Sequence, residues 1–454
     1  MAAKRSLLQE DVGLYNVARD GSALTSATLL AAIGNANSSE RMIFLNPGSW
    51  TLNANVTVPS TRGLFIPKGT TINKNGFALV VNGNLWVGDP NVAWHTGSGS
   101  FKWNFKRFTQ SGGVNVKEYG AKVDGVTDDT TALNTCLAEN THVFIPEGVL
   151  LHSGTIILNI GNRLSGTWTG PDAATKTDAG AFPYLSGSSL HYTGSGVAVE
   201  SSFSAAFVDG QICIDHLQIF SGGGTKGIHM KGILDIWLDF VCVNGQTFPA
   251  TTAGFSDAAV HFEAISGSPG FIGICRVTNS VIRYVTGYGI KVDGGNNLNA
   301  FTITGNRIQG CTLGGIYVAG HAMGWAISGN DIEGNGGNQI YAIYPVGWHV
   351  NGNYSEPPAG NGSPLYRFER AAALNLIGNN IYGTTVGATT ASLIHLGTTA
   401  FGFVSYGVTI QGNHIANSIA AWNLENVRGI TIRENVVFFN ITREIATGGG
   451  NIEG

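Results

Sequence analysis

The sequence predicts an all-β protein, a right-handed single-stranded parallel β-helix in which short strands coil around one axis. Two rows of strand-like segments recur at a common spacing, and an asparagine stands at the same place in most coils. The composition agrees, because Gly accounts for 65 of 454 residues and charged residues for 12%, which is typical of a turn-rich β-protein. With 43% hydrophobic residues, the chain is not expected to be disordered.

The first row consists of segments in which an apolar residue precedes an asparagine turn and another apolar residue follows it. Amide side chains at equivalent turns can hydrogen-bond from one coil to the next. Their spacing of 22 to 34 residues predicts coils of roughly two dozen residues. The successive asparagines are Asn279, Asn306, Asn330, Asn353, Asn379, Asn413 and Asn435.

The second row lies between these asparagines and reads apolar–polar–apolar, which is the alternation of a half-buried strand. Two rows that advance at one pitch favour a parallel solenoid over a propeller, whose blades repeat at about 40 to 50 residues. The polar positions of this row are expected to face outward. They are His229, His261, Lys291, Tyr317, Tyr341, Arg367, His395 and Asn423.

The chain is expected to contain two parts. Residues 1–113 form an N-terminal β-rich subdomain, either a first β-helix segment or an attachment region, because short apolar runs alternate there with Pro and Gly turns. Residues 114–454 form the parallel β-helix domain. A short helix is predicted near residues 130–138, after acidic residues that can bond to its free amide groups.

The segment from Val116 to Leu133, followed by Val143 to Gly148, resembles the opening of the pectate-lyase-like (pectin-lyase-fold) β-helix superfamily. It is most similar to the version found in phage tailspikes and polysaccharide depolymerases. The resemblance implies that the helix near 130–138 caps the solenoid, that the protein is a homotrimer, and that Asp124, Asp128 and Asp129 are structural. The superfamily hosts hydrolases, lyases, epimerases and structural proteins, so the resemblance does not identify the reaction. The Tyr-Gly-Phe-Asp-Pro-His motif of alginate-epimerase relatives is missing, which disfavours an epimerase.

Acidic residues at outward positions of the asparagine row are the candidate catalytic groups. Glu333 and Glu356 fall on adjacent coils, about 4.8 Å apart at the backbone, and Asp331 lies two residues before Glu333. Glycosidases use two carboxyl groups at about 5 to 9.5 Å, and like charges keep one of them protonated. We therefore expect Glu333 and Glu356 to be acid and base or nucleophile, with Asp331 assisting and with Arg307 and Tyr354 binding substrate. The alternative for each acid is a solvated strand end.

The second row offers a platform and a second pair of acids. Tyr317 is expected to lie over Tyr341, where sugar rings can pack, although ordinary stacking between coils also explains the pair. Glu263 and Asp293 also fall on adjacent coils and form the runner-up catalytic pair. His261 and Lys291 beside them have the chemistry for a β-elimination instead. No cofactor is expected, and no metal site is recognisable from residue spacing.

These observations predict a phage tailspike-like depolymerase that cleaves a bacterial surface polysaccharide (capsule, O-antigen or exopolysaccharide) by endo-glycosidic hydrolysis. The alternatives are a polysaccharide lyase and a non-catalytic glycan-binding or structural tail protein. A net charge of −4 without a basic block argues against a nucleic-acid partner.

The first residues contain no long apolar run, and no stretch reaches transmembrane length, so neither a signal peptide nor membrane insertion is expected. The five cysteines form no CxxC pair, and we expect buried thiols in a chain that folds in the bacterial cytoplasm. Such a protein would reach the virion tail or the extracellular space after lysis.

Overall fold

A computed structural model describes most of the chain. The described residues are 14–17, 22–35, 42–103, 113–168, 187–202, 210–221, 223–245, 254–265, 271–295, 297–358, 362–383, 393–397, 404–416 and 421–438. They divide into two compact units, Met1–Pro146 and Glu147–Gly454. The sequence predicts a subdomain boundary near residue 113, and this boundary stays a prediction. Within the described ranges, no helix is long and apolar enough to cross a membrane.

The first unit begins with short strands that coil through three small parallel sheets, β1-β2-β5-β8, β3-β6-β9 and β4-β7-β10. Because the strands visit the three sheets in turn, this part of the chain is itself a short β-helix. Its core includes Trp50, Leu64 and Leu79, which are fully buried. The elements are β1 (Leu14–Val17), α2 (Ser26–Asn35), β2 (Met42–Leu45), β3 (Gly48–Thr51), β4 (Val56–Val58), β5 (Gly63–Ile66), β6 (Thr70–Asn73), β7 (Leu79–Val81), β8 (Leu85–Val87), β9 (His95–Thr96) and β10 (Phe101–Trp103).

The rest of the first unit contains the predicted helix. It consists of β11 (Val114–Asn115), the 3₁₀ helix η1 (Val116–Tyr119), β12 (Asp124–Asp128), α3 (Thr130–Glu139) and β13 (His142–Phe144). Helix α3 covers the predicted range 130–138. The three aspartates before it serve the turn: Asp124 accepts from the Val126 and Thr127 amides, Asp128 from Thr130, and Asp129 from the amides of Lys122 and Val123.

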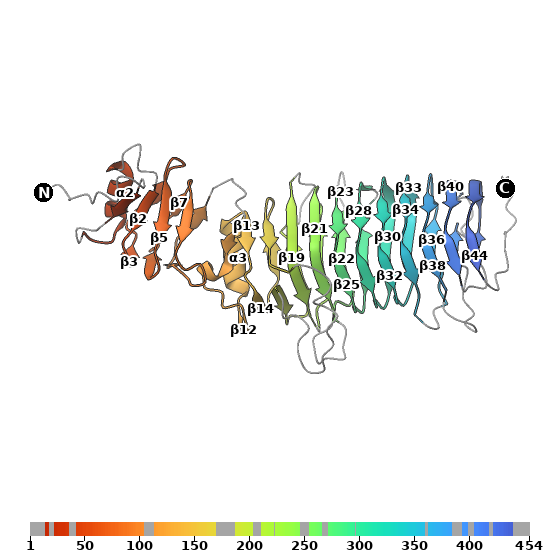
Figure 1. Ribbon diagram of the computed structural model, residues 1–454, viewed down its shortest axis with the longest axis horizontal. Helices are drawn as coiled ribbons and strands as arrows, with labels where there is room; N and C mark the ends of the chain where they lie inside the picture. The colour runs from red at the N-terminus through yellow and green to blue at the C-terminus, as the bar shows by residue number, and fades with distance from the viewer. Residues whose placement is uncertain are drawn as a thin grey trace. The chain divides into compact units, whose positions relative to one another are not determined.

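The second unit confirms the predicted parallel β-helix, because its strands form two long sheets in which every registered pair is parallel (Figure 1). We call the first the ladder sheet. Its strands in the second unit are β14 (Gly148–His152), β16 (Arg163–Ser165), β17 (Ser188–Tyr192), β19 (Ile212–Phe220), β21 (Ile236–Asn244), β24 (Arg276–Thr278), β25 (Val281–Arg283), β28 (Thr302–Thr304), β29 (Arg307–Gln309), β31 (Ala326–Ser328), β32 (Asp331–Glu333), β34 (His349–Asn351), β35 (Tyr354–Glu356), β37 (Asn375–Ile377), β38 (Asn380–Tyr382), β40 (Ser405–Gln411), β41 (His414–Ala416), β43 (Val427–Arg433) and β44 (Val436–Phe438).

We call the other the tyrosine sheet, after the side chains on its outer face. It is formed by the second row of the sequence repeat. Its strands are β15 (Ile156–Leu158), β18 (Val197–Ser201), β20 (Lys226–Lys231), β22 (Ala258–Glu263), β26 (Tyr288–Asp293), β30 (Gly314–Met323), β33 (Ile340–Val346), β36 (Tyr366–Glu369), β39 (Ile394–Leu396) and β42 (Trp422–Leu424), with β23 (Phe271–Gly273) and β27 (Asn297–Asn299) beside them.

The predicted asparagine column is present from Asn306 to Asn435. The Oδ1 atom of Asn330 accepts hydrogen bonds from the backbone nitrogen and the Nδ2 of Asn306, both at 3.0 Å, and the same pair of bonds recurs at each later step. Each Nδ2 also donates to a backbone carbonyl, as Asn353 does to Ile327. The column therefore joins the coils through buried side-chain amides.

The placement of Asn279 in this column was wrong. Ser280 takes the equivalent position, and its backbone nitrogen donates to Asn306 Oδ1 at 2.9 Å. Asn279 lies one residue earlier, where its φ of 50° matches the left-handed conformation of Gly305 (68°) in the next coil. Asparagine tolerates that conformation better than most residues, so here it replaces the glycine that usually precedes the column.

The residues predicted to point inward are buried. Ile308, Ile332, Ser355, Ile381 and Ile415 are fully inaccessible. Trp325 and Trp348 are also buried in the core, where they stack with ring centroids 4.6 Å apart and planes 6° apart. Side chains along each strand thus alternate between the core and the outside, as predicted. This alternation determines which residues are available to a surface site.

Candidate functional site

The predicted site residues lie on two different surfaces. Arg307, Asp331, Glu333, Tyr354 and Glu356 gather on the outer face of the ladder sheet, on the consecutive strands β29, β32 and β35. We call these five residues the acidic surface. Tyr317 and Tyr341, predicted to bind the same substrate, lie instead on β30 and β33 of the tyrosine sheet.

Strand register brings the acids of the acidic surface together as predicted. Glu333 pairs with Glu356, and Asp331 pairs with Arg307 on one side and Tyr354 on the other. Ile332 and Ser355 between them are buried in the core, so the flanking side chains on both strands must point outward. Three carboxyl groups therefore share one face within two coils.

The three acids have different partners. Arg307 Nη2 lies 2.9 Å from Glu333 Oε1, and its Nε lies 3.5 Å from Asp331 Oδ2. The hydroxyl of Tyr354 donates to Glu356 Oε2 at 2.6 Å. Partial burial, and then the nearby carboxylate of Glu333, raise the pKa of Asp331, while Arg307 offsets part of this effect. Glu333 thus has the closer contact with the guanidinium, while the pKa of its neighbour Asp331 on the same strand is raised.

An aromatic strip continues from the acidic surface along the ladder sheet. The rings of Tyr354 and Tyr382 are 5.6 Å apart, and those of Tyr382 and His414 are 5.5 Å apart. Sequence reasoning did not assign Tyr382 or His414 to the site. The repeat indicates that both side chains face outward, because they follow a column asparagine by three residues and by one residue. The diagonal ring contact between coils was not predictable from these positions alone.

The tyrosine sheet carries the predicted platform in altered form. Tyr317 and Tyr341 are register partners, but their rings meet edge to face at 68° with centroids 5.4 Å apart. Tyr288 stacks on Tyr317 at 4.6 Å. Tyr341 is engaged further, since its hydroxyl donates to Glu369 at 2.9 Å and Arg367 lies over its ring.

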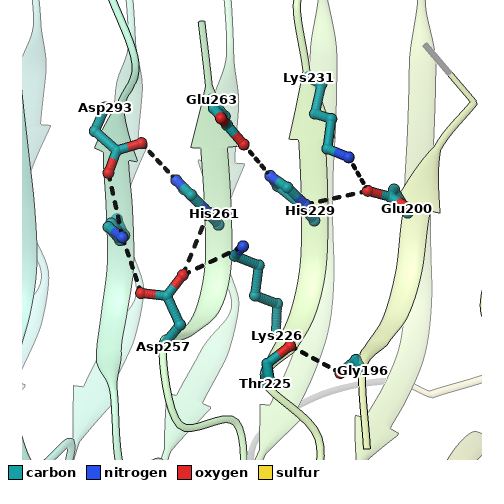
Figure 2. Close-up of polar contacts among 11 residues, drawn as sticks. Gly196, Glu200, Thr225, Lys226, His229, Lys231, Asp257, His261, Glu263 and Asp293 are labelled. Carbon is teal, nitrogen blue, oxygen red and sulfur yellow. Dashed lines mark hydrogen bonds and ion pairs between the residues drawn. The ribbon is translucent and has the colours of Figure 1, made fainter. Parts of the chain in front are cut away.

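Next to this platform, on β18 to β26, the runner-up acids belong to a dense network that we call the ion-pair cluster (Figure 2). The strand register aligns Glu200, His229, His261 and Lys291 in one row and Glu263 with Asp293 in the next. The cluster consists of Glu200, Lys226, His229, Lys231, Asp257, His261, Glu263, Lys291 and Asp293.

Two stacked histidines form the centre of the ion-pair cluster. Their rings are 4.7 Å apart and only 7° from parallel, and each side chain is 4% exposed. His229 Nε2 lies 2.7 Å from Glu263 Oε2, and His261 Nε2 lies 2.7 Å from Asp293 Oδ1 (Figure 2). The sequence row predicted that these residues face away from the core, but it did not predict that neighbouring side chains would cover them.

The surroundings of Glu200 and Asp293 in the ion-pair cluster favour the charged form of both acids. The polar contact with His229, supported by Lys231, lowers the pKa of Glu200 to about 2. Burial opposes ionisation of Asp293, but His261 and Lys291 outweigh burial and lower its pKa. Burial also lowers the pKa of His261, and Asp293 offsets only part of this. A carboxylate held in this way is a poor proton donor, whereas a neutral imidazole has a free lone pair.

Three side chains of the cluster have the geometry to hold a metal ion. The ligand atoms of His229, His261 and Glu263 all lie within 4.8 Å of one another. No short spacing in the sequence reveals them, because His229 and His261 belong to separate coils and meet only through the register of β20 with β22.

A family model, solved structures and one curated protein match parts of the chain. The family model described as rhamnogalacturonase A/epimerase, pectate lyase-like, matches residues 113–340. A solved point mutant of DFA-IIIase from Arthrobacter chlorophenolicus A6, in complex with DFA-III, is 13% identical, with a TM-score of 0.53 over 74% of this chain and 86% of that chain. At that identity the likeness shows the fold alone.

Two other matches are less extensive. The ORF18 structure of Geobacillus virus E2 is 13% identical, with a TM-score of 0.48 over 70% of this chain and 61% of that one. Among curated proteins, the non-secreted LysM effector LysM19 of Penicillium expansum is 47% identical over 57 residues, which are 12% of this chain. The match spans only 4% of that protein's length.

Proposed function

The chain belongs to the rhamnogalacturonase A/epimerase, pectate lyase-like family, and on that premise we propose that its acidic surface hydrolyses glycosidic bonds of a bacterial surface polysaccharide. The observation that carries the proposal is the unequal environment of Asp331 and Glu333. Burial and a neighbouring charge raise the pKa of Asp331, while Glu333 is paired with Arg307 at 2.9 Å. Two carboxyl groups with opposite protonation are what glycoside hydrolysis requires.

These environments assign roles to the three acids. Asp331 donates a proton to the oxygen of the leaving sugar as the glycosidic C–O bond breaks. Glu333, which is ion-paired with Arg307, either removes a proton from the attacking water or attacks the anomeric carbon itself. Sequence reasoning had given Asp331 an assisting role; its raised pKa makes it the better proton donor. Glu356 and Tyr354 share a hydrogen bond at the edge of the site and orient the sugar.

The aromatic strip supplies the binding surface next to these acids. The rings of Tyr354, Tyr382 and His414 lie next to one another on successive coils and offer aromatic surface on which the C–H faces of sugars can pack. A strip that runs along the coils suits a polymer with several sugar units bound in a row. This supports internal cleavage of a chain over removal of single sugars from its end.

The test is a digest of a panel of capsules, O-antigens and exopolysaccharides. The wild type is expected to shorten one polymer and to release one reducing end for each bond cut, without a new double bond. Asp331→Asn and the double variant Glu333→Gln/Glu356→Gln are expected to lose cleavage and to retain binding. The matched control is Glu263→Gln/Asp293→Asn in the ion-pair cluster, which is expected to keep cleavage.

The other outcomes contradict the proposal. Ultraviolet absorbance from an unsaturated product, lost in the ion-pair variants, would show β-elimination at the tyrosine sheet. Binding without shortening of any polymer that binds would show a non-catalytic glycan-binding or structural tail protein.

The biological setting proposed for this activity is a phage tailspike. The chain would fold in the bacterial cytoplasm, assemble as a homotrimer and reach the virion tail, or the outside of the cell after lysis. Light scattering of the purified protein tests the assembly, because a trimer of 47.6 kDa chains differs clearly in mass from a monomer.

A further inference from the structure

We propose that His229, His261 and Glu263 form a binding site for a divalent transition-metal ion of the Zn²⁺ type, which ties β20 to β22. The site lies on the tyrosine sheet, whereas the proposed hydrolysis uses the ladder sheet. The inference therefore goes beyond the proposed function and does not depend on it.

The three ligands converge because of the coil register. His229 and His261 are direct partners on adjacent strands, and Glu263 follows His261 by two residues on the same face. The Oε2 atom of Glu263 already lies 2.7 Å from His229 Nε2. Ligand atoms around tetrahedral Zn²⁺, with bonds of about 2.0 to 2.1 Å, stand about 3.3 Å apart. The three atoms lie within 4.8 Å of one another, so small side-chain rotations bring them to bonding distance.

The other ring nitrogen of each histidine faces a different carboxylate. His229 Nδ1 lies 3.3 Å from Glu200 Oε1, and His261 Nδ1 lies 3.6 Å from Asp257 Oδ2. Metal-binding histidines generally donate their second N–H to such a group, which fixes the tautomer and aims the free nitrogen at the metal. Both imidazoles of the cluster have a carboxylate on this second side at ion-pair distance, although neither Nδ1 forms a hydrogen bond with a described residue, and Figure 2 shows the acidic partners on opposite sides.

Glu263 differs from the other acids of the cluster in its ion-pair partner. Among the described residues, Glu200 pairs with Lys231, Asp257 with Lys226 and Lys291, and Asp293 with Lys291. Glu263 instead pairs with His229. A divalent ion held by the two imidazoles would balance the charge of the Glu263 carboxylate directly.

The donor set selects the class of metal. Two imidazole nitrogens and one carboxylate suit Zn²⁺ and its neighbours in the transition series, whereas Ca²⁺ and Mg²⁺ prefer all-oxygen sites. Asp293 Oδ1, which lies 2.7 Å from His261 Nε2, is placed to become a fourth ligand once the metal displaces that hydrogen bond.

The test is calorimetric titration of the full-length protein, freed of metal with a chelator, with ZnCl₂ and separately with CaCl₂. A single saturable Zn²⁺ site is expected, with no saturable binding of Ca²⁺. His261→Gln and Glu263→Gln are each expected to weaken Zn²⁺ binding by at least about tenfold. The matched control is His395→Gln, in the same outward row further along the sheet, which should leave the affinity unchanged. Co²⁺ in place of Zn²⁺ should give visible absorption in the wild type and lose it in the variants.

Absence of saturable Zn²⁺ binding by the wild type would overturn the proposal and leave the cluster as a network of polar contacts between histidines, lysines and acids. Equal affinity in wild type and Glu263→Gln would do the same. Glu263 has a 38% exposed side chain, so this variant serves as the deciding one if His261→Gln does not fold. No glycan is present in the titration, so its result is independent of the hydrolysis assay.

Discussion

Asp331 is the residue at which the proposed chemistry and the stability of the fold conflict. Its side chain is 40% exposed, yet burial of the rest and the carboxylate of Glu333 raise its pKa, and Arg307 compensates only partly. The folded chain therefore holds this proton more tightly than the unfolded chain does. The fold therefore becomes less stable as the pH rises from the ordinary pKa of aspartate, about 4, through the raised pKa of Asp331.

Asp331→Asn is expected to remove this pH-dependent loss. Near neutral pH the variant should melt at the same temperature as the wild type or higher, and below about pH 4 the difference should shrink. Glycan hydrolysis should fall by about 10²- to 10⁴-fold because the proton donor is gone. Thermal unfolding across this pH range and reducing-end assays measure the two effects. A variant that melts lower than the wild type at neutral pH would show that the contact with Arg307 outweighs burial.

At the scale of strands and turns, periodicity made much of the structure predictable. Alternation assigned Ile332 and Ser355 to the core and Glu333 and Glu356 to the surface, because a strand has a side-chain period of two. The error at Asn279 came from reading residue type without backbone conformation. A column position requires an amide or hydroxyl side chain. The position before it requires a residue that adopts the left-handed backbone conformation, and asparagine can fill either position, as Asn279 does the second.

The sequence predicted which residues of the candidate sites are aligned by strand register, but not which side chains pair with one another. The row of His229, His261 and Lys291 followed from the repeat, and so did the adjacent acids Glu263 and Asp293. The pairing of each histidine with two carboxylates did not, because it depends on side-chain conformations on three coils. The separation of Tyr317 from the acidic surface was missed for a different reason: the repeat defines two rows but not which outward faces share one surface.

The asparagines of the column are expected to stabilise the fold far more than the exposed residues next to them in the sequence. In Asn379→Ala, the buried amide of Asn353 and the carbonyl of Val350 lose their partners. Each unsatisfied buried group costs about 1 to 3 kcal/mol. The adjacent Asn380→Ala removes an exposed side chain and should change stability by less than about 0.5 kcal/mol. Urea unfolding of both variants compares them, and equal losses would show that the column does not hold the coils together.

At the scale of the whole β-helix domain, each registered strand within the described residues pairs with strands of the coils before and after it. A protein of this kind behaves nearly one-dimensionally, so that its stability is a sum over coils and the contacts between neighbouring coils. Its surface sites are likewise assembled from three or four adjacent coils. The acidic surface and the ion-pair cluster therefore occupy different coils and can be removed separately.

Deleting one full coil tests this architecture. Removal of residues 331–353 joins Asn330 to Tyr354, so that Tyr354, Ser355 and Glu356 take the register positions of Asp331, Ile332 and Glu333. Asn330 then meets Asn379 in the column, and β36 takes the place of β33 beside β30. The shortened protein should fold and bind Zn²⁺, because His229, His261 and Glu263 lie in other coils, but it should not hydrolyse glycan. Deletion of residues 331–341, about half a coil, breaks the register and should prevent folding. Circular dichroism and thermal melting compare the two deletions; if both fold equally well or equally badly, the coils are not the independent units that this structure implies.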